Sequence, residues 1–107
     1  MKLSQDSEIA SIKITQYLLK TREEDDKSKY LAGAGYTAAH AERLLGDLRG
    51  LLTVDAEFIQ VTDYGDKYRI RGILKGPNGR TLHVVSIWMI ERATGQTKFV
   101  TLYPDKK

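Results

Sequence analysis

The sequence predicts an α+β domain, with two to three N-terminal helices packed on one face of a four-stranded antiparallel meander sheet. Apolar residues recur at helical spacing up to about residue 52, and the pattern changes to period two from Val54 onward. Short turn signals then separate four strand-like runs, and consecutive strands joined by short turns pair as a meander. A length of 107 residues fits one domain over 1–107, with a helical part at about 7–52 and a sheet at about 54–103.

Three helices are expected in the first half of the chain, over residues 12–20, about 26–34 and roughly 38–52. Ser11 and Thr37 precede the first and third helices and suit the N-cap position. Gly35 follows the second helix, where glycine adopts a positive φ without steric cost. The third helix carries a stripe of leucines at helical spacing, which predicts that it packs on the sheet.

Four strands are expected over residues 54–61, 67–75, 80–92 and 97–103. The turns between them are Asp63–Asp66, Gly76–Gly79 and Ala93–Gln96, each containing glycine or the residues that favour turns. The third strand is long, apolar and rich in β-branched residues, which favour strands.

The pairing across the turns decides which side chains share a face. A symmetric loop at Gly76–Gly79 pairs Arg69 with Ser86, and a loop about Thr94 pairs Trp88 with Thr101. One face then carries the polar set Arg69, Arg71, Ser86, Trp88, Thr101 and Tyr103. The opposite face carries Ile70, Val85, Ile87, Met89, Val100 and Leu102 and suits helix packing.

A second register remains open, because Pro-Asn-Gly also fits a type I turn with a glycine bulge at Gly79. That turn pairs Ile70 with Ser86 and exchanges the two faces. We prefer the first register because it leaves one face cleanly apolar.

Charge is divided unevenly along the chain. Residues 1–66 hold 8 Lys/Arg and 12 Asp/Glu, a net charge of −4, whereas residues 67–107 hold 9 Lys/Arg and 2 Asp/Glu, a net charge of +7. A basic sheet region suggests a polyanionic partner, although solvated surface charge is the simpler explanation.

Composition excludes several classes of protein. The chain has no cysteine, so a disulfide framework, a cysteine-based zinc site and a thiol nucleophile are excluded. It has no apolar run long enough for a signal peptide or a membrane span, so we expect a cytoplasmic protein with no membrane partner. We see no set of metal ligands and no glycine-rich phosphate loop, and we expect no cofactor.

Several motifs resemble a small bacterial domain family of unknown function over nearly the whole chain. They are Asp26–Leu31 with Gly35-Tyr36, Gly76–Arg80, Ser86-Ile87-Trp88 and Thr101–Pro104. That family looks like a member of the barnase–EndoU–colicin–RelE nuclease superfamily, and its Ser-x-Trp strand is similar to that of colicin D-type tRNases. The resemblance implies a toxin-type RNase that cleaves RNA, with tRNA as the first-ranked substrate, and a cognate antitoxin or immunity protein as partner.

Metal-independent RNA cleavage needs a proton acceptor, a proton donor and a cation at the phosphate. The predicted catalytic residues are Lys27, Arg69, Arg71, Ser86, Thr101 and Tyr103. Trp88, Lys67 and Arg80 are predicted to bind substrate, with Trp88 stacking on a base. By the resemblance, Lys27 is matched to the lysine of colicin D-type enzymes, but no histidine follows it at a similar short spacing.

Structural roles compete with each of these assignments. Trp88 is also expected for a core position, and Ser86 and Thr101 for a cross-strand hydroxyl pair. In the preferred register His83 falls on the apolar face and His40 on the exposed side of its helix, so neither is a predicted site residue. The alternative function is therefore a non-catalytic toxin-like module that binds RNA or a protein.

Overall fold

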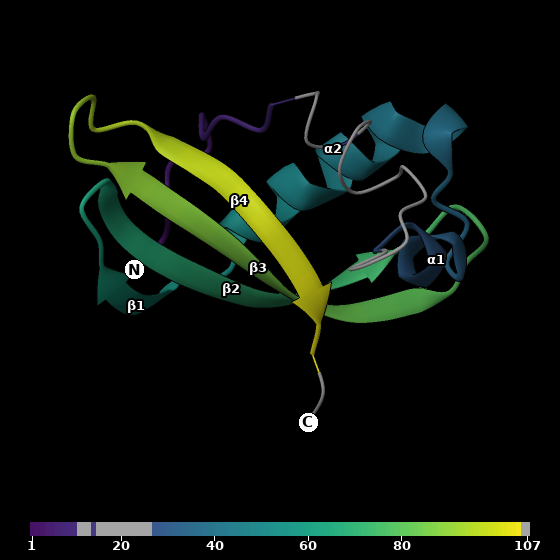
Figure 1. Cartoon of the computed structure of the whole chain (residues 1–107). Helices are drawn as coiled ribbons and strands as arrows, with labels where there is room; N and C mark the ends of the chain where they lie inside the picture. The colour runs from purple at the N-terminus through teal and green to yellow at the C-terminus, as the bar shows by residue number, and fades with distance from the viewer. Residues whose placement is uncertain (11–13, 15–26, 106–107) are drawn as a thin grey trace.

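The computed structural model describes residues 1–10, 14 and 27–105. It contains one four-stranded antiparallel sheet in the order β1-β2-β3-β4 (Figure 1). The strands are β1 (Glu57–Val61), β2 (Gly65–Lys75), β3 (Thr81–Glu91) and β4 (Thr97–Pro104). The predicted α+β class and meander topology are confirmed.

The prediction of two to three helices packed on the sheet is only partly correct. The described residues contain two α-helices, α1 (Lys27–Ala32) and α2 (Ala41–Gly50), and α2 is flanked by the 3-10 turns η2 (Ala38–His40) and η3 (Leu51–Thr53). Figure 1 shows α2 crossing one face of the sheet, whereas α1 lies beside the β2–β3 turn. The helix predicted over 12–20 lies outside the described residues, apart from Ile14.

The predicted helix ends are partly correct. Gly35 has a φ of 94°, so it takes the left-handed conformation that ends the α1 region. Thr37 makes no capping bond to the backbone, and its hydroxyl instead lies 2.9 Å from Nδ1 of His40. The third predicted helix consequently begins as a 3-10 turn rather than as one continuous α-helix.

The core lies between α2 with η3 and the inner face of the sheet. Leu44 and Leu48 of α2 are fully buried against this face, as are Ile70 and Leu74 of β2. Gly72 completes the fit, because a Cβ there would lie 2.5 Å from a methyl carbon of Leu51. A larger residue at position 72 would therefore require the Leu51 side chain to move.

Tyr36 joins the chain between the helices to the sheet. Its buried hydroxyl donates to the Asp47 carboxylate at 2.5 Å and lies 3.2 Å from the backbone carbonyl oxygen of Lys75. Burial, followed by the hydrogen bond to Asp47, raises the pKa of the Tyr36 phenol well above its ordinary value.

The β2–β3 turn adopts the glycine-bulge form. The backbone N–H of Gly79 donates to the Gly76 carbonyl at 3.0 Å, and Gly79 has a φ of 89°. Asn78 ties this turn to the end of α1, because its backbone N–H donates to the Ala34 carbonyl at 3.2 Å. Local turn chemistry and a tertiary contact therefore act together on the register.

The preferred register is wrong by one residue in both hairpins. Ile70 pairs with Ser86, and Ser86 pairs with Leu102, as the alternative turn predicts for the first hairpin. Ile87 pairs with Thr101 but Trp88 pairs with Phe99, because a bulge in β4 lies between these two partners and shifts the pairing by one more residue. The side chains of β3 therefore lie on the opposite faces from those predicted. Ser86 and Trp88 point to the core, while Val85 and Ile87 point away from the helices.

Candidate functional site

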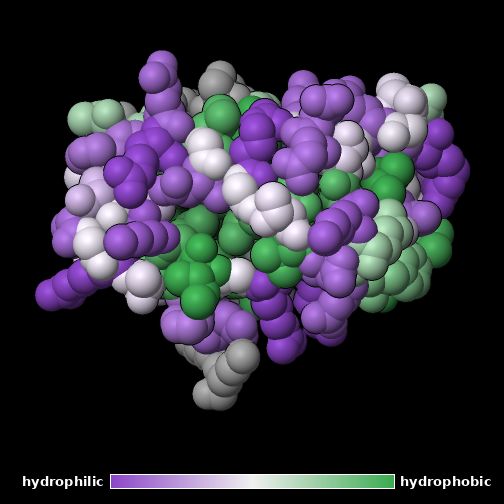
Figure 2. All heavy atoms as spheres, turned by 180° about the vertical axis from the view of Figure 1, so that it is seen from behind, coloured by the Kyte–Doolittle hydropathy of each residue, from purple (hydrophilic) through white to green (hydrophobic). Residues whose placement is uncertain are grey.

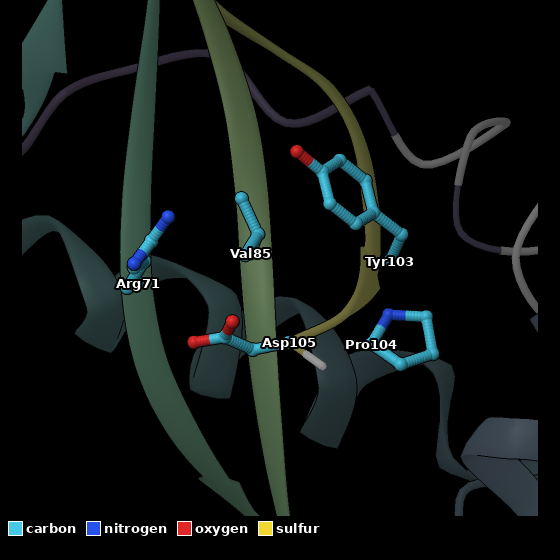
Figure 3. A pocket seen from close by; sticks show the side chains of 5 residues that line it. All are labelled: Arg71, Val85, Tyr103, Pro104 and Asp105. Carbon is cyan, nitrogen blue, oxygen red and sulfur yellow. The ribbon is translucent and has the colours of Figure 1, made fainter. Parts of the chain in front are cut away.

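The side of the sheet away from α2 forms a polar surface with an apolar floor. We call this surface the outer face; its members are Lys67, Arg69, Arg71, Ile73, His83, Val85, Ile87, Thr101 and Tyr103. Figure 3 shows Arg71, Val85 and Tyr103 on three adjacent strands, with the helices behind the sheet. Val85 and Ile87 belong to this face but are buried. The centre of the outer face is therefore apolar and packed, and the polar side chains lie around it.

Two predicted site residues do not belong to this surface. Ser86 and Trp88 are both fully buried on the inner face. The Trp88 indole N–H donates to the Ser86 hydroxyl at 2.8 Å, and that hydroxyl donates to the Ile70 carbonyl at 3.1 Å. Trp88 also packs edge to face on Phe99, with ring centroids 5.3 Å apart. In this conformation neither residue can touch a substrate, so the stacking role of Trp88 and the phosphate role of Ser86 have no geometric support.

The two predicted arginines lie on the outer face but differ in their bonding. Arg69 donates twice to the Glu57 carboxylate, at 3.0 and 3.1 Å, so its charge is already partly neutralised. Arg71 is exposed, and no ion pair or hydrogen bond engages its guanidinium within the part of the chain that the structure describes. The Arg71 guanidinium is therefore ready to take an anionic ligand.

Arg71 lies between two neighbouring pockets. One, of about 430 Å³, is lined by Arg71, Val85, Tyr103, Pro104 and Asp105 (Figure 3). The other, of about 290 Å³, is lined by Arg71, Gly72, Ile73, His83 and Asp105. Because both pockets share Arg71 and Asp105, they bring a guanidinium, an imidazole, a phenol and a carboxylate to one area. We call this area the Arg71 trough.

His83 is the functional candidate that the sequence reasoning missed. It was assigned to the apolar face, and the one-residue shift places it on the outer face opposite Ile73. Its carbonyl oxygen accepts hydrogen bonds from the Tyr30 hydroxyl at 2.9 Å and from the Asp105 backbone N–H at 2.8 Å. The backbone that carries the imidazole is thus fixed from two sides. The Pro-Asn-Gly turn was the signal that could have found it.

Tyr30 connects α1 to this end of the trough. Burial raises the pKa of the Tyr30 phenol above its ordinary value, and the nearby Asp105 carboxylate raises it further. Tyr30 therefore stays a neutral hydrogen-bond donor to the His83 carbonyl through the physiological range.

The other predicted residues surround the trough or lie outside the description. Lys67 belongs to the outer face on β2, and Thr101 is half-buried on β4. Arg80 is exposed next to the β2–β3 turn, and its backbone N–H donates to the Asn78 side chain at 2.9 Å. Lys27 begins α1, but its side chain lies outside the described structure.

The described residues offer neither a metal site nor a membrane-spanning helix. Over residues 1–10, 14 and 27–105, no three His, Asp or Glu side chains come together in a way that could hold a metal ion. Within the same residues, neither helix has the length and apolar character required to cross a bilayer.

Comparison with known proteins places the chain in a family. A model of the family described as "Domain of unknown function (DUF6883)" matches residues 3–106. The chain belongs to this family. A search of curated proteins found no match.

Among solved structures, this DUF6883 domain is similar to a chain of a "Contact-dependent growth inhibition toxin - immunity protein complex" from Klebsiella pneumoniae 342. The TM-score is 0.68 at 13% sequence identity, and the match covers 91% of this chain and 98% of the other. At that identity the likeness shows a shared fold.

Proposed function

We propose that this DUF6883 domain is a toxin-type ribonuclease that cleaves RNA without a metal ion, with the Arg71 trough as its active site. The observation that carries the proposal is the Arg71 guanidinium, which has no ion pair or hydrogen bond among the described residues, beside His83, Tyr103 and Asp105. The resemblance to the barnase–EndoU–colicin–RelE superfamily and the shared fold with a chain of a toxin–immunity complex support it.

The trough contains each group that the reaction needs. In RNA cleavage the 2′-hydroxyl attacks the neighbouring phosphorus and the 5′-oxygen leaves, which gives a 2′,3′-cyclic phosphate and a 5′-hydroxyl. The Asp105 carboxylate accepts the 2′-hydroxyl proton, and the protonated His83 imidazole donates a proton to the leaving 5′-oxygen. Arg71 stabilises the added negative charge on the phosphate oxygens.

Substrate binding involves the rest of the outer face. Tyr103 is 42% exposed at the rim of the trough and can stack on a base of single-stranded RNA. Lys67 and Arg80 lie towards opposite ends of β2 and β3 and extend the positive charge along the RNA backbone. The resemblance to colicin D-type tRNases makes tRNA the first substrate to test.

We further propose that a dedicated protein partner of antitoxin or immunity type keeps the domain inactive in the cell that produces it. The toxin–immunity complex to which the fold is similar supports this partner class.

The test is cleavage of total RNA and of purified tRNA by the wild type and by His83→Gln and Arg71→Gln. General acid catalysis and charge stabilisation are each worth about 10²–10³-fold, so each variant should lose at least 100-fold activity. His40→Gln is the matched control, because it removes the other histidine of the chain, which lies away from the outer face. Mass spectrometry of the products should show a 2′,3′-cyclic phosphate.

Two results would contradict the proposal. One is a folded wild type that cleaves no RNA at any protein excess; salt-dependent RNA binding without product would then identify a binding module. The other is full activity of His83→Gln, which would remove the assigned proton donor.

A further inference from the structure

The Arg71 trough contains an exposed apolar side chain that the proposed chemistry does not use. Ile73 lies on the outer face of β2 and is 56% exposed, whereas its neighbour Leu74 is fully buried on the inner face. Ile73 lines the smaller pocket of the trough together with His83. An isoleucine that is mostly exposed contributes little to the core, so its side chain is available to a ligand.

The side chains of the trough form two rows across the sheet. In the first row, Arg71 of β2 pairs with Val85 of β3, and Val85 pairs with Tyr103 of β4. Figure 3 shows the Arg71 and Tyr103 side chains on either side of the buried Val85. The larger pocket, of about 430 Å³, includes all three residues. A base bound there would rest on Val85 and contact the Tyr103 ring. We call these three residues the Tyr103 row.

The second row lies one step along the strands, towards the β2–β3 turn. Ile73 pairs with His83, and the Asp105 backbone N–H donates to the His83 carbonyl oxygen at 2.8 Å. We call these three residues the His83 row; all three line the smaller pocket, of about 290 Å³. Residues two positions apart on a strand are separated by roughly 6.5 Å, whereas stacked bases lie roughly 3.4 Å apart. Two adjacent nucleotides therefore occupy both rows only if their bases are unstacked.

The positions of the proton donor and the proton acceptor set the direction of the RNA. The leaving 5′-oxygen belongs to the nucleotide on the 3′ side of the cleaved bond, so the donor His83 must lie beside that nucleotide. The attacking 2′-hydroxyl belongs to the nucleotide on the 5′ side. Asp105 and Arg71 line both pockets, as required of groups that act at the junction between the two nucleotides.

We propose that the trough is a pair of subsites for two adjacent, unstacked nucleotides of single-stranded RNA, with the 5′ base on the Tyr103 row and the 3′ base on Ile73. The direction rests on the proposed function, because it follows from the roles of His83 and Asp105; the two subsites rest on strand pairing and exposure. An aromatic ring and an aliphatic side chain contact the face of any base, so the site selects unpaired RNA rather than a particular base.

The test uses a dinucleotide that binds but does not react. A 2′-deoxyribose on the 5′ nucleotide removes the attacking hydroxyl, and two further probes of this kind lack either the 5′ base or the 3′ base. Binding is measured by NMR titration. Tyr103→Ala should weaken the Kd of the complete probe about 5–100-fold and leave the probe without a 5′ base unaffected. Ile73→Ala should weaken the complete probe about threefold or more and leave the probe without a 3′ base unaffected.

Tyr64→Ala and Val61→Ala are the matched controls. These residues are 79% and 64% exposed, but they lie beside the start of β2, whereas the trough lies towards its end. Figure 2 shows hydrophobic side chains gathered at the side of the molecule where β1 lies. Both control variants should bind all three probes as the wild type does.

Each other outcome overturns part of the proposal. The reverse pattern, in which Tyr103→Ala acts through the 3′ base, would overturn the direction. Equal losses for all three probes, or no binding of the complete probe to the wild type at millimolar concentration, would overturn the subsites. Because no probe is cleaved, a wild type that cleaves RNA but shows the reverse pattern keeps the ribonuclease assignment. A wild type that shows the expected pattern but cleaves no RNA loses that assignment while the subsites stand.

Discussion

Replacement of Ser86 by alanine tests which strand register the protein has. The observed register makes Ser86 a buried structural residue, whereas the other register makes it an exposed catalytic one. In the structure the Ser86 hydroxyl is the acceptor for the Trp88 indole N–H at 2.8 Å, inside the core. Ser86→Ala leaves that N–H buried without a partner, which costs about 1–3 kcal/mol of unfolding free energy. For a domain of this size, the expected fall in Tm is roughly 4–12 °C.

The assay is thermal and urea unfolding followed by tryptophan fluorescence, since Trp88 is the only tryptophan in the chain. Ser4→Ala is the matched control: Ser4 is exposed and its hydroxyl accepts one hydrogen bond, from the Asp6 N–H, so the loss should stay within about 0.5 kcal/mol. RNA cleavage by folded Ser86→Ala should remain within about twofold of the wild type. Unchanged stability together with a large loss of cleavage would refute the reasoning and return Ser86 to the active site.

The remaining predictions concern the core and the turns. Above pH 10 an unfolded tyrosine releases its proton while folded Tyr36 keeps it, so wild-type stability should fall with rising pH, and Tyr36→Phe should fall less steeply in urea titrations at pH 9–11. Gly46→Ala should raise stability by about 0.5–1 kcal/mol, because a Cβ there meets no other group within 4 Å in the interior of α2. Gly76→Ala should lower stability by about 1–3 kcal/mol or more, because its Cβ would lie 1.9 Å from the Ala34 carbonyl oxygen; equal melting of both glycine variants would contradict this.

The sequence was sufficient for the class, the strand order and the approximate ends of most elements, because periodicity and turn residues are local signals. It was not sufficient for the register. Val85, Ile87 and Met89 alternate with Val84, Ser86 and Trp88, so β3 is apolar on both faces and hydrophobicity alone does not say which face is buried. The decisive contact joins Asn78 to Ala34, far apart in the chain, and no local pattern reports it.

The candidate site shows the same division between local and tertiary information. Arg71 and Tyr103 were predicted and do share an open face, because they keep their relation to each other under a one-residue shift in both hairpins. Ser86 and Trp88 were predicted on that face and lie on the inner face, whereas His83 was predicted on the apolar face and lies on the outer face. The basic character of the second half was readable from composition, whereas coordinates were required to show that Arg69 pairs with Glu57 and that Arg71 of the same face has no ion pair among the described residues.

The contact between Asn78 and the end of α1 has a consequence for the order of folding. A hairpin of β2 and β3 formed in isolation has two registers with similar burial, since either face of β3 can serve as an apolar one. The backbone and side-chain bonds from Asn78 to Ala34 and Gly33 stabilise only the native one. The helix segment therefore acts on the sheet as an intramolecular template, and a chain that begins after residue 36 would lack the contact that selects between the two pairings.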